Sequence, residues 1–76
     1  MESFEPKKLA LIRIWQILKD YSDYDHPLTQ EDIAVKLENE YGIVIERKAI
    51  SRNISLLKEA GIDIESRRAG SYLERR

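Results

Sequence analysis

The stretch from Glu46 to Gly61, ERKAISRNISLLKEAG, gathers the side chains of this chain that are best suited to binding a charged ligand. On the period of an α-helix it has one polar arc and one apolar arc. Arginine and lysine supply donors to phosphate oxygens, and long polar side chains can reach base edges in the major groove of DNA. The stretch therefore predicts a recognition helix, with an ordinary amphipathic helix and a solvated polar face as the alternative. The polar arc holds Arg47, Lys48, Ser51, Arg52 and Ser55, and the apolar arc holds Ala49, Ile50, Ile54, Leu56, Leu57 and Ala60.

A second group of cations is expected at the tip of a β-hairpin. Residues 62–65 alternate apolar and polar side chains, residues 68–70 favour a turn, and residues 71–74 can return as a second strand. Arg67 and Arg68 would then lie beside the predicted recognition helix, over a DNA backbone or an adjacent minor groove. A solvated hairpin whose arginines bind nothing is the alternative. The hairpin residues expected to face the core are Ile62, Ile64, Tyr72 and Leu73.

Catalytic or metal-binding chemistry has little material in this sequence. The chain has no cysteine, and His26 is its single histidine. A cysteine-ligated zinc site therefore cannot be assembled, and a metal site or a nucleophile-base pair would have to be supplied by carboxylates alone. The Asp and Glu residues are spread along predicted solvent faces, and nothing suggests a matched pair of carboxylates. We expect neither an enzyme nor a metal or cofactor.

Length and hydropathy indicate one small domain. The chain has 76 residues, enough for three helices and a hairpin but for little further core, and residues 1–76 are taken as a single domain. No apolar run approaches the about 20 residues of a membrane span, and the N-terminus lacks the apolar core of a signal peptide. We therefore expect a cytoplasmic protein that does not enter a membrane.

Charge is unevenly distributed along the chain. Residues 1–46 hold 5 basic and 10 acidic side chains, a net charge of −5, whereas residues 47–76 hold 8 basic and 4 acidic, a net charge of +4. The total of −1 argues against a general nucleic-acid binder. A basic half that starts at the predicted recognition helix is what a localised DNA footprint would produce.

A first helix is expected over about residues 6–21, because Pro6 suits the first turn of a helix. Leu9 and Ile12 fall outside its main apolar arc, among charged and polar side chains. They are either contact residues for a partner or singly exposed apolar side chains of a common kind. The main arc is wide enough to pack on two other helices. It comprises Ala10, Leu11, Ile14, Trp15, Ile17, Leu18 and Tyr21.

A second helix is expected to begin after Thr29. Thr29 is the predicted N-cap, and Asp32 can complete a capping box with it. The helix should run to about Tyr41, and Gly42 should end it in the left-handed conformation. Its expected inner face consists of Ile33, Ala34, Leu37 and Tyr41.

The link from residue 42 to residue 45, GIVI, is too apolar to be solvated and should lie beneath the helices. Glu46 takes the cap position of the basic helix, where Ser, Thr, Asp or Asn would be stronger. Asn53 lies within the apolar arc of that helix, so its amide must find a hydrogen-bond partner. We expect that partner to be a backbone group at a neighbouring helix end.

Three helices followed by a hairpin, with a basic third helix, form the plan of a winged helix-turn-helix: a mainly α fold in which a three-helix bundle carries a β-hairpin wing. The chain resembles the N-terminal winged-helix domains of bacterial DeoR-like regulators, especially those joined to a C-terminal WYL domain. The residues that carry this resemblance are Leu18 and Ser22 in ILKDYSD, Leu28, Thr29, Ile33, Leu37 and Tyr41 in HPLTQEDIAVKLENEYGI, Arg47, Ile50, Arg52 and Gly61 in RKAISRNISLLKEAG, and the following DIE.

The resemblance implies roles for particular residues. Thr29 and Gln30 would touch phosphate. Two departures affect the third helix, because family members often have Thr where this chain has Ala49 and Asp where it has Asn53. A side-chain contact that stabilises the helix is therefore missing or altered. The groove-reading positions implied are Arg47, Lys48, Ser51 and Arg52, and the wing positions are Arg67 and Arg68.

We expect sequence-specific binding of double-stranded DNA by the reading head of a transcriptional regulator, with residues 47–60 in the major groove and residues 67–70 on the backbone or minor groove. The alternative is a winged-helix module that binds another protein, not DNA, through Leu9 and Ile12. We also expect residues 1–76 to be the N-terminal part of a longer regulator that dimerises through regions outside this chain or through Leu9 and Ile12. The predicted DNA-binding set is Thr29, Gln30, Arg47, Lys48, Ser51, Arg52, Ser55, Arg67 and Arg68.

Overall fold

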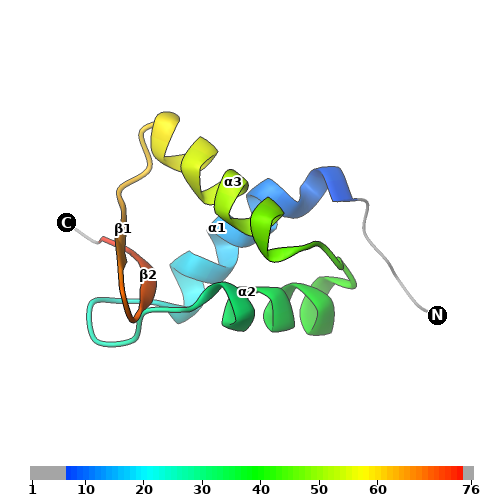
Figure 1. Ribbon diagram of the computed structural model, residues 1–76, viewed down its shortest axis with the longest axis horizontal. Helices are drawn as coiled ribbons and strands as arrows, with labels where there is room; N and C mark the ends of the chain where they lie inside the picture. The colour runs from blue at the N-terminus through cyan, green and yellow to red at the C-terminus, as the bar shows by residue number, and fades with distance from the viewer. Residues whose placement is uncertain (1–6, 75–76) are drawn as a thin grey trace.

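Three helices followed by a two-stranded antiparallel hairpin make up the chain in the computed structural model, which describes residues 7–74 (Figure 1). This confirms a mainly helical fold with a small hairpin. Pro6, the expected start of the first helix, lies outside the described residues. The elements are a 3-10 turn, Lys7–Leu9; α1, Ala10–Tyr21; α2, Gln30–Lys36, continued by a π turn, Leu37–Tyr41; α3, Arg47–Glu59; β1, Ile64–Arg67; and β2, Gly70–Leu73.

The core forms where the apolar faces of the three helices meet. The hairpin closes this core through Ile64 and Tyr72, both of which are buried as predicted. Most of the arc expected on α1 is also confirmed, since four of its seven residues are buried and two more are half-buried. The seven large side chains that are fully buried are Ile14, Ile17, Leu18, Ile33, Leu37, Ile43 and Ile50.

Tyr21, at the end of α1, is the part of that arc that was predicted wrongly, because 45% of it is exposed. Its ring lies under the Lys36 ammonium, 4.0 Å from the ring centroid. A side-chain hydrogen bond to the Glu40 carboxylate raises the pKa of the Tyr21 hydroxyl. A tyrosine at a helix end can thus keep its polar tip in water while its ring packs on a neighbouring side chain.

Leu9 and Ile12 were expected to share an exposed position off the core, and the structure separates them. Leu9 is half-buried and packs against the core, whereas Ile12 is 46% exposed. Of these two residues, therefore, only Ile12 is an exposed apolar side chain. In residues 7–74 no helix is both long enough and apolar enough to cross a bilayer.

The start of α2 is the confirmed capping box. The Thr29 hydroxyl accepts a hydrogen bond from the Asp32 backbone N–H at 3.0 Å, and the Asp32 carboxylate accepts one from the Thr29 N–H at 3.0 Å. Gly42 ends the segment with a φ of 67°, also as predicted. The pattern did not predict that the last turn, Leu37–Tyr41, would widen into a π turn.

The buried face of α3 is narrower than predicted. Ile50, Ile54 and Leu57 are buried, but Leu56 is 50% exposed and Ala60 is exposed, because both lie at the edges of the arc. The Asn53 amide donates to the Ala49 carbonyl of its own helix at 2.8 Å. The expectation of a partner at a neighbouring helix end was therefore wrong, since an intrahelical carbonyl satisfies the amide.

The link before α3 is only partly beneath the helices: Ile43 is buried and Val44 is 59% exposed.

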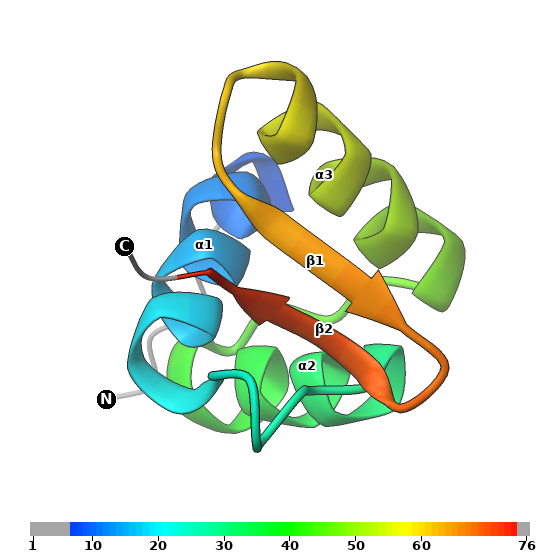
Figure 2. The same cartoon turned by 90° about the vertical axis from the view of Figure 1, so that its left-hand side faces the viewer.

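The hairpin is joined to the segment that leads into α2. Its register pairs Ile64 with Leu73 and Arg67 with Gly70, so β1 begins at Ile64 and not at the predicted Ile62. Leu28 and Ser71 exchange two backbone hydrogen bonds, each of 2.8 Å, and Figure 2 shows this segment running beside β2. Gly70 has a φ of 140°, and a Cβ there would lie 2.6 Å from the Leu28 carbonyl. The close approach of the Leu28 backbone therefore requires glycine at position 70.

Candidate nucleic-acid interface

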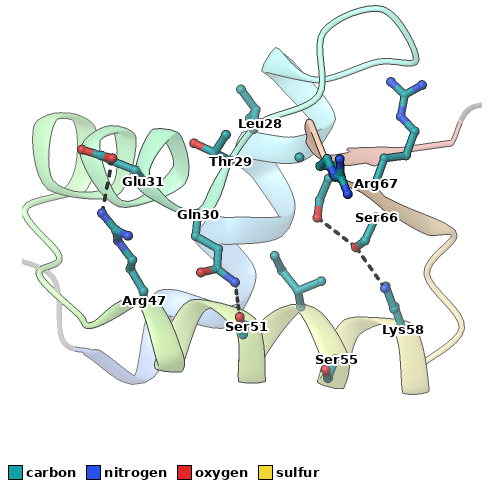
Figure 3. Close-up of a pocket in the computed structure, with 14 residues that line it drawn as sticks. Leu28, Thr29, Gln30, Glu31, Arg47, Ser51, Ser55, Lys58, Ser66 and Arg67 are labelled. Atoms are coloured by element: carbon teal, nitrogen blue, oxygen red, sulfur yellow. Dashed lines mark hydrogen bonds and ion pairs between the residues drawn. The ribbon is translucent and has the colours of Figure 1, made fainter.

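An open cleft lies between the first turn of α2, one side of α3 and the hairpin (Figure 3). Its volume is about 510 Å³. It brings together seven of the nine predicted site residues: Thr29, Gln30, Arg47, Ser51, Ser55, Arg67 and Arg68. It also includes residues that were not predicted: Leu28, Glu31, Ile54, Lys58, Ser66, Gly70 and Ser71.

The polar face of α3 divides into two rows. Arg47, Ser51 and Ser55 follow one another at intervals of four residues, so they lie on one side of the helix and line the cleft. Lys48 and Arg52 occupy the adjacent row, where they are exposed but do not line the cleft. The predicted polar arc of α3 therefore presents one row to the cleft and one row to open solvent.

The first turn of α2 reaches this face of α3 through the side chain of Gln30. Its amide Nε2 donates a hydrogen bond to the Ser51 hydroxyl, as Figure 3 shows. The Thr29 hydroxyl is already an acceptor in the capping box. It retains its own hydrogen as a donor, so it can still bind an oxygen in the cleft.

Glu31 is a cleft residue that the sequence analysis did not identify. Its Oε1 lies 3.3 Å from a terminal nitrogen of Arg47, and the side chains are 70% and 66% exposed, respectively. The contact joins residues sixteen positions apart. Only the position of Glu31 next to Gln30 could have suggested it, because neighbours in a first helical turn share an end of the helix.

Lys58 extends the basic side of the cleft towards the hairpin. Its Nζ donates to the Ser66 hydroxyl at 3.1 Å, and the hydroxyls of Ser66 and Ser71 lie 2.9 Å apart. The sequence did contain a signal, since Lys58 follows Ser51 by seven residues and Arg47 by eleven, which is the same side of a helix. A cation thus stands at each end of the α3 row.

The two arginines of the hairpin have different surroundings. Arg67 is the last residue of β1, and its guanidinium lies 4.6 Å from the Tyr24 ring centroid and 5.1 Å from that of Tyr72. It also donates to the Tyr24 carbonyl at 2.6 Å. Arg68 is an exposed residue of the turn itself. Arg67 is therefore held against the hairpin's aromatic support, whereas Arg68 is exposed at the tip.

The aromatic pair behind Arg67 is part of the hairpin's support. The Tyr24 and Tyr72 rings meet edge to face, with centroids 5.8 Å apart and an interplanar angle of 85°. Burial raises the pKa of the Tyr72 hydroxyl. The planar guanidinium can stack on both rings while one N–H binds a carbonyl, a geometry that lysine could not reproduce.

The single histidine lies away from the cleft, in the turn before α2. His26 Nδ1 is 2.9 Å from Asp23 Oδ1 at an exposed site, and this hydrogen bond lowers the pKa of the Asp23 carboxyl. Within residues 7–74, no group of three or more His, Cys, Asp or Glu side chains could hold a metal ion. The cleft itself is lined mainly by cations and hydroxyls, with one amide, the Glu31 carboxylate and the apolar side chains of Leu28 and Ile54. An open site of this composition fits an extended anionic ligand better than a small apolar one.

Comparisons of this chain with protein-family models, with curated proteins and with solved structures found no match. The functional conclusion therefore rests on the geometry and chemistry of the cleft.

Proposed function

We propose that this chain is a winged helix-turn-helix domain that binds double-stranded DNA sequence-specifically. It would be the reading head of a bacterial transcriptional regulator of the DeoR-like or WYL-containing type, acting in the cytoplasm. The observation that carries the proposal is the cleft, which gathers seven of the nine residues expected to contact DNA from three separate segments.

The dimensions of α3 suit the proposed ligand. The helix has 13 residues, and the major groove of DNA is about 12 Å wide, which admits an α-helix. With α3 in the groove, Lys48 and Arg52 on its outer row and Ser51 on the cleft row would face base edges. Lys58 and Arg68, at the two sides of the cleft, would face the phosphate backbone.

Charge supports a local footprint on DNA despite the acidic total. The cations of α3 and of the hairpin belong to the basic half of the chain, with its net charge of +4. Acidic side chains are concentrated in the first half, where Glu38 and Glu40 are exposed on the π turn outside the cleft. Such a distribution would orient the domain on DNA, because most cations of the basic half lie on α3 and the hairpin.

Titration of the protein with a short random-sequence DNA duplex at two salt concentrations tests the proposal. The two phosphate contacts assigned to Lys58 and Arg68 would give a slope of log K against log salt of about −1.8, so binding should weaken roughly 12-fold between about 50 and 200 mM salt. Lys58→Ala should weaken binding, and the matched control Lys8→Ala, outside the cleft, should not. Absence of binding at low salt, or binding that salt leaves unchanged, would exclude this function.

One observation favours a second candidate, a winged helix that binds another protein. Ile12 and Leu56 are 46% and 50% exposed, which leaves apolar surface on α1 and α3 without a partner. Under this proposal Ile12→Glu abolishes association and DNA is not bound. The same titration separates the two candidates. Sedimentation of this chain then shows whether Ile12 contributes to a homodimer.

A further inference from the structure

Two successive residues of α2 each hold one residue of the α3 row that lines the cleft. Gln30 donates to the Ser51 hydroxyl, and Glu31 accepts from the guanidinium of Arg47 (Figure 3). Arg47 and Ser51 are four residues apart, which places them one above the other on α3. The first turn of α2, fixed by its capping box, thus controls two positions on the helix expected to read DNA.

The contact between Glu31 and Arg47 has little to contribute to folding. Both side chains are about two-thirds exposed, so water and salt screen the attraction between them. Its effect lies in the direction and charge of the guanidinium. A carboxylate 3.3 Å from one terminal nitrogen favours one orientation of the Arg47 fork and partly offsets its positive charge. The other N–H donors of the fork remain able to bind a base edge.

We propose that Glu31 is a positioning residue that makes the cleft selective for sequence. Resting on the proposed DNA binding, the inference adds a role for an acidic side chain at the interface. General affinity for DNA comes from cations that contact phosphate, and specificity is the difference between affinities for two sequences. Glu31 lowers the general affinity for DNA, because it offsets the charge of Arg47 and repels phosphate. It raises the specificity, because it aims the arginine fork at bases.

In the part of the chain that the structure describes, no ion pair with a carboxylate is shown for the other cations of the cleft. Lys58 bonds to a hydroxyl, which leaves its charge in place, and Arg68 is exposed on the turn. These two suit phosphate contacts that are the same for every sequence. Arg47 is therefore the one cleft cation within residues 7–74 that an ion pair with an acidic side chain is shown to restrain.

Glu31→Gln tests the proposal, because the amide keeps the shape of the side chain and removes its charge. The variant should bind a random-sequence duplex more tightly than wild type does, with a slope of log K against log salt that is steeper by about 0.9. The gain should then shrink about 3.5-fold between about 50 and 200 mM salt. Preference for a duplex enriched by the wild-type protein from a random pool should fall at least about fivefold.

Two controls separate positioning from general repulsion. Glu38→Gln makes the same change of charge on the exposed π turn outside the cleft and should leave both the slope and the preference near their wild-type values. In an Arg47→Ala background, Glu31→Gln should lose most of its effect on the preference, since the side chain that it positions is gone.

Three outcomes would overturn the inference. If Glu31→Gln and Glu38→Gln behave alike while the wild type binds with a salt-dependent slope, DNA binding stands and the role of Glu31 falls. If the effect of Glu31→Gln on the preference for the enriched duplex persists unchanged without Arg47, Glu31 acts by repelling phosphate directly and not by positioning. If the wild-type protein binds no duplex at any salt concentration, the proposed function and this inference fall together.

Discussion

The cleft has a helical wall, formed by α3 and the first turn of α2, and a hairpin wall, formed by residues 66–71. Different kinds of contact hold the two walls. The helical wall depends on side-chain bonds from Gln30 and Glu31 to α3, at exposed positions. The hairpin wall depends on the backbone pair of Leu28 and Ser71, with Arg67 packed on two tyrosine rings behind it. Exposed side-chain bonds can exchange for a ligand at low cost. Backbone bonds cannot be exchanged without losing the pairing, so one wall can adapt and the other keeps its shape.

The largest loss of stability is expected at Gly70, where the backbone of Leu28 leaves no space for a side chain. Gly70→Ala would place a Cβ 2.6 Å from the Leu28 carbonyl at a φ of 140°, so it should lower the free energy of unfolding by about 3 kcal/mol or more. Gly61→Ala is the matched control, because Gly61 also has a positive φ but nothing lies within 4 Å of an added Cβ. It should cost about 1 to 2 kcal/mol. Equal losses in urea unfolding would show that the Leu28 contact is unimportant.

Binding through the outer row of α3, which holds Lys48 and Arg52, should depend on the DNA sequence. Arg52→Ala removes a side chain from the outer row of α3, so we expect a loss of about 1 to 3 kcal/mol on a duplex selected by the wild-type protein and little loss on a random one. Lys58→Ala should instead weaken both duplexes alike. Titrations of both variants on both duplexes check this. If the two variants exchanged these patterns, the roles assigned to Arg52 and Lys58 would be reversed.

The first turn of α2, which is part of the helical wall, is held by the capping box of Thr29 and Asp32. Thr29→Ala removes the hydroxyl that accepts from the Asp32 N–H, and should lower stability by about 0.5 to 2 kcal/mol. Since a domain of this size melts about 4 to 8 °C lower for each kcal/mol lost, a thermal scan resolves the change. Thr29→Ser keeps the hydroxyl and should restore most of the midpoint. An unchanged midpoint in Thr29→Ala would mean that the cap does not stabilise α2.

The smallest effect separates the two hairpin arginines. Arg67→Ala removes the cation stacked on Tyr24 and Tyr72 and should lower stability by about 0.5 to 1 kcal/mol. Arg68→Ala, on the turn, should change stability by less than about 0.5 kcal/mol, but should reduce the slope of log K against log salt by about 0.9. Parallel melts and titrations measure both quantities. Identical behaviour of the two variants would show that Arg67 does not anchor the hairpin.

Local features of this fold could be predicted from sequence because their partners lie within a few residues of one another. Thr29 and Asp32 form a cap across one turn, and Gly42 ends its segment through its own backbone conformation. The division of α3 into a buried and a polar face follows from helical periodicity alone. The same periodicity placed Leu56 and Ala60 on the buried face, since it cannot tell how far a neighbouring helix extends around the arc.

Contacts between distant segments could not be predicted. The guanidinium of Arg67 binds the carbonyl of a residue 43 positions earlier, and Glu31 meets Arg47 across 16. Each depends on the angle at which two elements pack, which no short pattern encodes. Sequence reasoning thus found the residue types of the candidate site, while the restraints on Arg47 and Arg67 emerged only from the packing of α2 and the hairpin.

The backbone pair of Leu28 with Ser71 sets the spacing of the cleft as well as supporting one wall. Leu28 is the last residue of the hairpin wall's attachment, and Thr29, the next residue, caps α2. The two attachments are therefore adjacent in the chain, which fixes the spacing between the backbone of the hairpin and the backbone of the first turn of α2, even where side chains of the helical wall can adapt. In the proposed complex the side chains of α3 could rearrange but this backbone spacing could not, so stiff and deformable DNA sequences would bind with different free energies even at base pairs that the protein does not touch.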